Sequence, residues 1–168
     1  MRNLVLIGMM GCGKTTVGKL LAQKLDFPFV DTDAYIESKL GRSIPELFAQ
    51  EGEGYFRARE RETAEELAQQ ENLVIACGGG LPTQEAAIAP LKASGMVFWL
   101  RRDAGQIYDS GILGDRPLAQ EGRAAFVERA AQREPIYHRW ADYFISNSNT
   151  PEEAEALIST IYQEVCQP

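Results

Sequence analysis

One stretch decides the fold of this 168-residue chain: Gly8-Met9-Met10-Gly11-Cys12-Gly13-Lys14-Thr15. It matches the pattern G-x-x-x-x-G-K-[ST], with an apolar run before it at 4–7 and a helical pattern after it at 14–25. Glycines in such a stretch let successive backbone N–H groups turn inward onto phosphate oxygens, and the helix N-terminus adds the positive end of its dipole. Because a chance glycine-rich turn would lack these flanks, the stretch predicts a phosphate-binding loop in an α/β fold.

The polar side chains of this loop fit a nucleoside triphosphate and its metal ion. Lys14 supplies a charge for the β- and γ-phosphates, and the Thr15 hydroxyl is a ligand for Mg²⁺. Cys12 lies at the start of the helix, where a redox role and a plain space-filling role are both open. The predicted nucleotide-binding residues of this segment are Gly11, Cys12, Gly13, Lys14, Thr15 and Thr16.

Strand and helix patterns alternate along the whole chain. Apolar runs typical of buried strands lie at 4–7, 27–30, 73–76, 96–100 and 143–146. Helical patterns begin near residues 14, 33, 44, 53, 83, 103, 124 and 151, with capping-box signatures at Ser43 and Thr150. This alternation predicts one domain over 1–168, a three-layer αβα fold with a five-stranded parallel sheet covered by helices on both faces. The stretch 110–121 has no periodicity and is expected to be a mobile loop.

Composition narrows the range of partners. The net charge of −7 disfavours nucleic acid and membrane surfaces, which attract basic proteins. Neither a membrane-spanning run nor a secretory signal is recognised, and three scattered cysteines predict neither a disulfide framework nor a zinc site. We therefore expect a cytoplasmic protein, monomeric because no amphipathic stretch is left without a place in the fold. An anionic ligand would have to meet a local group of arginines.

Two segments follow predicted strands, at the edge where open α/β sheets bind ligands. Asp31-Thr32-Asp33 follows the second strand. One carboxylate could face Mg²⁺ through water and the other an acceptor hydroxyl, or Asp33 could merely cap the helix that begins near Ala34, and spacing leaves both open. Gly78-Gly79-Gly80 ends the third strand and would allow a ligand to approach the backbone closely.

Three arginines stand where an anion could be bound, and each also has an ordinary explanation. Arg57 and Glu60 share one face of a charged helix, where a solvated surface pair is the default interpretation. Arg116 lies in the predicted mobile loop and could neutralise a transferring phosphoryl group, or could be an unimportant surface residue. Arg133 is placed near a helix end, where the dipole alone favours a cation. His138, the only histidine, is interpreted as structural or surface-exposed.

Taken together, these segments resemble the shikimate kinases. The likeness covers nearly the whole chain, in order and in spacing. The phosphate loop is shared with many kinases, whereas its combination with the later motifs is far more specific. The segments that carry it are 8–15, Asp31-Thr32-Asp33, 41–44, Phe56-Arg57 within 53–60, Gly78-Gly79-Gly80, Arg116-Pro117-Leu118 and 133–137.

The resemblance implies ATP and shikimate as substrates, Mg²⁺ as the cofactor, and a role for each motif. Lys14, Asp33 and Arg116 would be catalytic, with Asp33 holding the acceptor hydroxyls as base or its assistant. Arg57, oriented by Glu60, and Arg133 would grip the shikimate carboxylate. Asp31 would lie near Mg²⁺ beside Thr15, and the backbone of Gly78, Gly79 and Gly80 would line the shikimate pocket. Asn149 would lie in an adenine-side loop at 147–151. The resemblance also implies a substrate-binding region at 33–61 and a lid at 109–122.

One departure from the family concerns the lid. Such kinases usually carry a further basic residue several positions before Arg-Pro-Leu, and 108–113 contains none. Tyr108 is a candidate to stack on adenine in its place. The alternatives are another small-metabolite kinase such as gluconate kinase, and a nucleotide-binding relative with weakened catalysis. A GTPase-like switch ranks last because the chain lacks an Asn-Lys-x-Asp segment.

Overall fold

The computed structural model describes residues 2–166 and forms a parallel sheet of five strands. The strand order across the sheet is β2-β3-β1-β4-β5, and every neighbouring pair is parallel. The prediction of a five-stranded parallel sheet is confirmed. The strands are β1 (Asn3–Ile7), β2 (Phe29–Asp31), β3 (Val74–Ala76), β4 (Gly95–Arg101) and β5 (Tyr143–Ser146).

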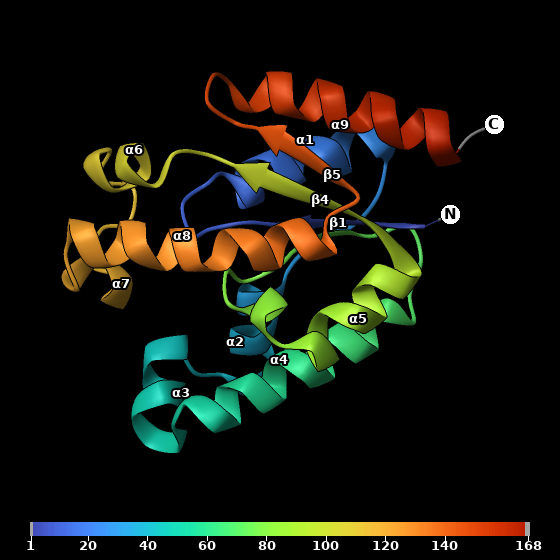
Figure 1. The fold of residues 1–168 in the computed structure, drawn as a ribbon. Coiled ribbons are helices and arrows are strands. Elements are labelled where there is room, and N and C mark those ends of the chain that lie inside the picture. Colours follow the sequence, from blue (N-terminus) through green and yellow to red (C-terminus); the bar gives the residue numbers. More distant parts are fainter. Residues whose placement is uncertain (1, 167–168) are drawn as a thin grey trace.

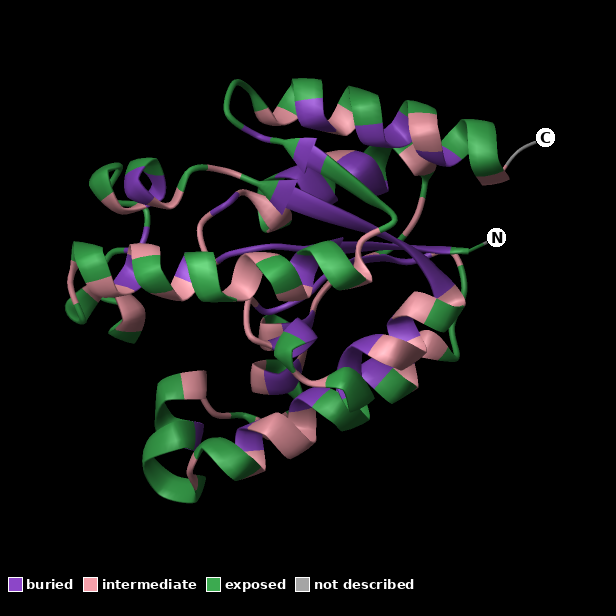
Figure 2. Ribbon diagram, in the orientation of Figure 1, coloured by how far each residue is buried: buried purple, intermediate pink, exposed green. Residues whose placement is uncertain are grey.

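Helices cover both faces of this sheet (Figure 1). Side chains alternate between faces along a strand, so β1 supplies Leu4 and Leu6 to one apolar cluster and Val5 and Ile7 to the other. Strands β1, β3 and β4 are buried almost throughout, as Figure 2 shows in purple, whereas β2 is half-buried and β5 is largely exposed. The first cluster is covered by α1 (Lys14–Leu25) and α9 (Pro151–Cys166), and the second by α4 (Glu53–Ala68) and α5 (Glu85–Ser94).

The strand order places the phosphate loop at the switch point of the sheet. The chain leaves the central strand β1 for β2 and β3 on one side and later crosses to β4 and β5 on the other. Ligands of open α/β sheets bind outside the carboxyl ends of the strands at such a point. The loop at 8–13 occupies it, because it joins β1 to α1.

A small helical arm stands beside the sheet, formed by α2 (Thr32–Leu40), α3 (Ile44–Glu51) and the start of α4. Its own cluster of buried Ile36, Leu47 and Phe56 holds the three helices together. Helix α3 begins at the predicted capping box, in which Ser43 accepts from the Glu46 N–H and Glu46 accepts from the Ser43 N–H.

The structure corrects the expectations for the lid side of the molecule. The stretch at 110–121 contains a short helix, α7 (Pro117–Gln120), which is too short to show periodicity; Pro117 suits its first turn. Helix α6 (Ala104–Asp109) precedes it. Helix α8 (Arg123–Trp140) runs past the expected end near Tyr137 with Pro135 inside it, and α5 begins at Glu85 after a short 3₁₀ turn, η1 (Leu81–Thr83). Within 2–166 no helix is both long and apolar enough to cross a bilayer.

Candidate active site

The phosphate loop is closed by its own lysine. Lys14 Nζ donates to the carbonyl oxygens of Gly8 at 2.8 Å and Met9 at 2.9 Å. Gly13 ends the loop as the N-cap of α1 with φ of 100°, a conformation that favours glycine. Thr15 and Thr16 are exposed in the first turn of α1. The lysine therefore curls around the space where the predicted phosphates would lie.

Asp31 joins this loop to the acceptor side. The Thr15 hydroxyl donates to Asp31 Oδ2 at 3.0 Å, while Asp31 Oδ1 accepts from the backbone N–H groups of Asp33 and Ala34. Asp31 is thus the N-cap of α2, and the alternative that Asp33 caps this helix is wrong. The hydroxyl and carboxylate predicted to serve Mg²⁺ lie side by side.

One carboxylate oxygen of Asp33, in the first turn of α2, has no hydrogen-bond partner in the part of the chain that the structure describes. This oxygen, Oδ1, is buried. Burial, and then repulsion from Asp31 and Glu60, raises the pKa of Asp33 from 3.8 to about 6, although Lys14 opposes the shift. A carboxyl group with a pKa this close to neutrality is suited to accept a proton from a substrate hydroxyl.

The three glycines after β3 bring the acceptor-side residues together. A Cβ atom at Gly78 would lie 2.5 Å from Asp33 Oδ1, one at Gly79 would lie 3.5 Å from Arg133 Nη1, and one at Gly80 would lie 2.7 Å from Arg57 Nη1. Three side chains from α2, α4 and α8 therefore converge on one short backbone segment. The segment is fixed from behind, because Thr32 Oγ1 accepts from the Gly78 N–H and Tyr137 Oη donates to the Gly79 carbonyl at 2.7 Å.

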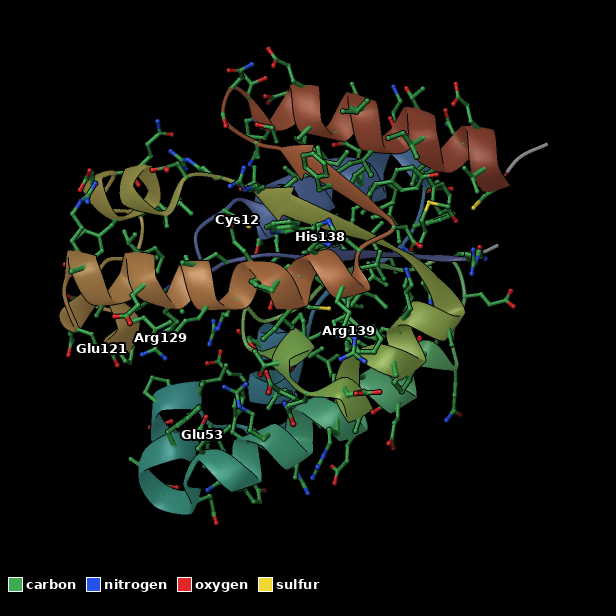
Figure 3. All side chains as sticks on the ribbon, viewed as in Figure 1. Cys12, Glu53, Glu121, Arg129, His138 and Arg139 are labelled. Carbon is green, nitrogen blue, oxygen red and sulfur yellow. The ribbon has the colours of Figure 1, made fainter. Side chains whose placement is uncertain are left out.

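Arg57 belongs to a buried network, which overturns the default interpretation of a solvated surface pair. Arg57 Nη1 donates to Glu60 Oε2 at 2.6 Å, and the Glu60 side chain is only 1% exposed. Gln84 Nε2 donates to the same oxygen at 2.7 Å, while Glu53, labelled in Figure 3, contacts the guanidinium from the exposed side at 3.4 Å. The guanidinium remains partly open to solvent, with its direction set by Glu60.

Arg133 faces the site from the middle of α8. Its Nη1 atom lies 3.9 Å from Met9 Sδ in the phosphate loop. The helix continues seven residues beyond it to Trp140, so the interpretation that Arg133 merely complements the helix dipole is wrong, because that effect is confined to the last turn. His138 is exposed, as expected, and Figure 3 shows it on α8.

Two predicted residues do not reach the site. Arg116, on the lid, is exposed, and its side chain forms no hydrogen bond or ion pair with residues 2–166. Asn149 is exposed and donates to Glu153 Oε2 at 2.9 Å. Both lie on segments expected to touch the nucleotide, and their roles there stay predictions.

The base of the lid is fastened to α8. Arg123 donates to both Asp109 carboxylate oxygens, at 2.9 and 3.0 Å, and Arg129 donates to Glu121 at 2.5 Å in the pair labelled in Figure 3. Tyr108 packs on Phe126 and donates to the Ala119 carbonyl at 3.0 Å. Its side chain therefore connects α6 to the lid and is not free to stack on adenine. These contacts hold both ends of the lid and leave Arg116 between them.

Three residues of the site's framework were not singled out by sequence reasoning. Gln84 supports Glu60, Tyr137 supports Gly79, and the Asn147 side chain donates to the Cys12 carbonyl at 2.8 Å. Their only sequence signal is position: Gln84 stands just before a helix, and Asn147 directly after β5, at the ligand edge of the sheet. Tyr137 was quoted only as the end of a motif.

Glycine at position 80 is expected to be required for substrate affinity. An alanine Cβ would come within 2.7 and 2.8 Å of the two Arg57 Nη atoms and push this flexible end aside, whereas the Gly80 backbone, with φ of −90°, accepts alanine without strain. If Arg57 binds the carboxylate of shikimate, as the resemblance implies, losing one charge-assisted contact predicts about a tenfold rise in the KM of shikimate. Gly54→Ala, where a Cβ meets nothing within 4 Å, is the matched control, and steady-state kinetics of both variants is the measurement. Equal KM values would contradict the assignment of Arg57.

The comparisons with known proteins agree on one family. A family model described as shikimate kinase matches residues 10–166. A shikimate kinase from Clostridium botulinum is 37% identical over 162 residues, which cover 96% of this chain and 98% of the relative. The solved structure of a shikimate kinase from Acinetobacter baumannii in complex with shikimate has a TM-score of 0.88 and 36% identity, and the match covers 98% of this chain and 93% of that one.

A gluconokinase of known structure is a more distant neighbour. The enzyme from Sinorhizobium meliloti has a TM-score of 0.59 and 14% identity, over 99% of this chain and 98% of that one. At this identity the likeness shows a shared fold and nothing about the acceptor.

Proposed function

Since this chain belongs to the shikimate kinase family, we propose that its site transfers the γ-phosphoryl group of ATP to the 3-hydroxyl of shikimate, a step of aromatic amino acid biosynthesis. The observation that carries the proposal is the position of Gly79. A Cβ there would lie 3.3 Å from the Met10 N–H nitrogen and 3.5 Å from both the Gly8 carbonyl and Arg133 Nη1. The phosphate loop and Arg133, the arginine proposed to bind the carboxylate, therefore both lie next to Gly79.

The acceptor is held by planar guanidinium groups. Shikimate carries a carboxylate, which a pair of arginines binds with charge-assisted hydrogen bonds in fixed geometry. Arg57 is aimed by Glu60, and Arg133 is placed by α8, so both stand ready before the substrate arrives. The hydroxyl-bearing ring of shikimate then lies over the backbone of Gly78, Gly79 and Gly80, because these glycines have no side chains to keep the ring away from the backbone.

The chemistry is mostly alignment and neutralisation of charge. Asp33 accepts the proton of the attacking hydroxyl, which its raised pKa allows near neutral pH. Lys14 leaves the Gly8 and Met9 carbonyls to bind the β- and γ-phosphates. Arg116 arrives with the lid and stabilises the charge on the transferring group, while the lid excludes water that would otherwise hydrolyse ATP.

The residues present fit Mg²⁺. Within 2–166 no three His, Cys, Asp or Glu side chains gather into a metal cage. Mg²⁺ in kinases is usually held by one or two protein oxygens together with phosphates and waters, and the neighbouring Thr15 hydroxyl and Asp31 carboxylate are such a pair. When bound, the ion would be held by Thr15 and Asp31 and would neutralise charge on the phosphates.

The wider setting belongs to the same proposal. The chain would act as one kinase domain, with a substrate-binding region at 33–61 and a lid at 109–122, as a monomer in the cytoplasm. The free cysteines Cys12, Cys77 and Cys166 fit a reducing compartment. Cys12 is wholly buried, which supports the space-filling role over the redox role.

One assay tests the substrate. ADP release would be coupled to a spectroscopic signal in three parallel reactions, with shikimate, with gluconate and without an acceptor. We expect turnover with shikimate alone, because Arg57, Arg133 and Asp33 match a ring carboxylate with hydroxyls. Preference for gluconate would favour another small-metabolite kinase, and hydrolysis without an acceptor, or no turnover, would favour a catalytically weakened relative.

A further inference from the structure

The phosphate loop is held from outside by the side chain of one buried asparagine. Asn147 follows β5 directly and is 8% exposed. Its backbone N–H donates to the Arg101 carbonyl at 2.8 Å, which ties it to the end of β4. Its side-chain Nδ2 donates to the carbonyl oxygen of Cys12 at 2.8 Å, and Figure 3 labels Cys12 in the turn between β1 and α1. The contact bridges two segments 135 residues apart in the sequence.

Because the peptide group is planar, the contact with the Cys12 carbonyl also sets the direction of the Gly13 N–H. The carbonyl of Cys12 and the N–H of Gly13 belong to the same trans peptide and point in opposite directions. If Asn147 pins the oxygen on its own side, the Gly13 N–H is directed to the opposite side. Phosphate loops bind their ligand through such inward N–H groups.

The fit between the two segments is close. A Cβ atom at Gly13 would come within 2.3 Å of Asn147 Nδ2, and the left-handed φ of 100° there also favours glycine. Gly13 is therefore required by its conformation and by the asparagine that lies against it. The two residues form a matched pair from different ends of the chain.

The Asn147 side chain is only half satisfied. Its Oδ1 atom is buried and accepts no hydrogen bond from the described part of the chain. The hydrogen bond to the Cys12 carbonyl is therefore the one polar contact that this side chain makes with residues 2–166, and a buried acceptor left unpaired is unfavourable. Asn3 is the structural counterpart: it is also buried, yet its Oδ1 accepts from the Leu73 N–H and its Nδ2 donates to the Gln70 carbonyl.

We propose that Asn147 is a positioning residue for nucleotide binding: by holding the Cys12 carbonyl it keeps the Gly13 N–H directed at the bound phosphates. The proposal rests on nucleotide binding at this loop. Asn147 acts through the Cys12–Gly13 peptide, and it is distinct from Asn149, the exposed residue two positions on that was predicted to lie beside the adenine.

The test compares three variants of the full chain. Asn147→Leu keeps the size but removes the donor, and Asn147→Ala removes it without any risk of overpacking. Asn3→Leu removes a buried asparagine at the start of β1, far from Asn147 in the sequence. It serves as the matched control for loss of stability alone. For each protein the Kd of ADP is measured by calorimetry, the KM of shikimate at saturating ATP by the coupled assay, and the Tm by thermal unfolding.

Both Asn147 variants are expected to bind ADP about tenfold more weakly, the loss of one charge-assisted hydrogen bond, with the KM of shikimate unchanged. Asn3→Leu is expected to lower the Tm and leave the Kd of ADP as in the unmodified chain. Unchanged ADP affinity in both Asn147 variants, or an equal loss of affinity in Asn3→Leu, would overturn the proposal. A natural chain that does not bind ADP at all would instead refute the proposed function.

Discussion

Replacing Asp33 with asparagine is expected to slow turnover at least a hundredfold and to stabilise the protein at the same time. The carboxylate is the proposed proton acceptor, and removing a general base of this kind typically costs 10²- to 10⁴-fold in rate. The gain in stability has a separate cause. Asp33 carries a buried oxygen without a hydrogen-bond partner in 2–166, and its ionised form is disfavoured by burial and by Asp31 and Glu60.

The sign of the stability effect follows from the direction of the pKa shift. Folding raises the pKa of Asp33 from 3.8 to about 6, so the folded state holds the proton more tightly than the unfolded state. Stability contributed by this group is present below pH 3.8, falls as the pH rises toward 6, and is lost above it. That difference in pKa corresponds to about 3 kcal/mol, the upper limit of what Asp33→Asn should recover at pH 7.

The same shift predicts how activity depends on pH. Only ionised Asp33 accepts a proton, so kcat/KM for shikimate is expected to fall about tenfold per pH unit below about 6. The measurements are a pH–rate profile of the natural chain and urea unfolding of the variant at pH 5 and 7, where the gain should be larger at pH 7. Asp31→Ala is the control, because it removes a helix cap and should cost about 1 kcal/mol. If Asp33→Asn is less stable than the natural chain at pH 7, the ionised Asp33 carboxylate does not destabilise the folded state.

The parts of the site that the sequence predicted well are those set by local rules. The phosphate loop needs a strand, glycines and a helix in immediate succession, and the start of α3 needs Ser43 and Glu46 at capping distance. The five strands followed from short apolar runs, because buried parallel strands are apolar on both faces. Each of these patterns is complete within about a dozen neighbouring residues.

The parts that the sequence left open depend on contacts between distant segments. Arg57–Glu60 and Arg59–Glu62 have the same spacing on the same helix, yet only the first pair has a buried glutamate: the side chain of Glu60 is 1% exposed and that of Glu62 is 58% exposed. Glu60 is buried where Gln84 donates to it. Spacing also could not assign the cap of α2: the choice of Asp31 depends on how β2 enters the helix. The family resemblance supplied the residue roles, and the structure supplied the geometry that gives them a physical basis.

Arg116→Ala is expected to lower kcat about a thousandfold while leaving the KM of shikimate nearly unchanged. An arginine that stabilises charge on a transferring phosphoryl group contributes 10³- to 10⁵-fold in rate. Shikimate would still be gripped by Arg57 and Arg133, which belong to α4 and α8 and do not depend on the lid.

The structure makes this variant unusually easy to interpret. Arg116 is exposed and its side chain has no hydrogen-bond or ion-pair partner within 2–166, so its removal should leave the Tm unchanged. Asp109–Arg123 and Glu121–Arg129 fasten the two ends of the lid, so the lid would still close over ATP. Arg139→Ala, on α8, removes another exposed arginine, one that lies outside the proposed site, and is expected to retain full activity. Single-turnover kinetics with the two variants would separate chemistry from binding. A parallel loss in kcat and in shikimate affinity would mean that Arg116 supports the acceptor site, and an unchanged kcat would mean that the phosphoryl charge is neutralised by Lys14 and the metal ion alone.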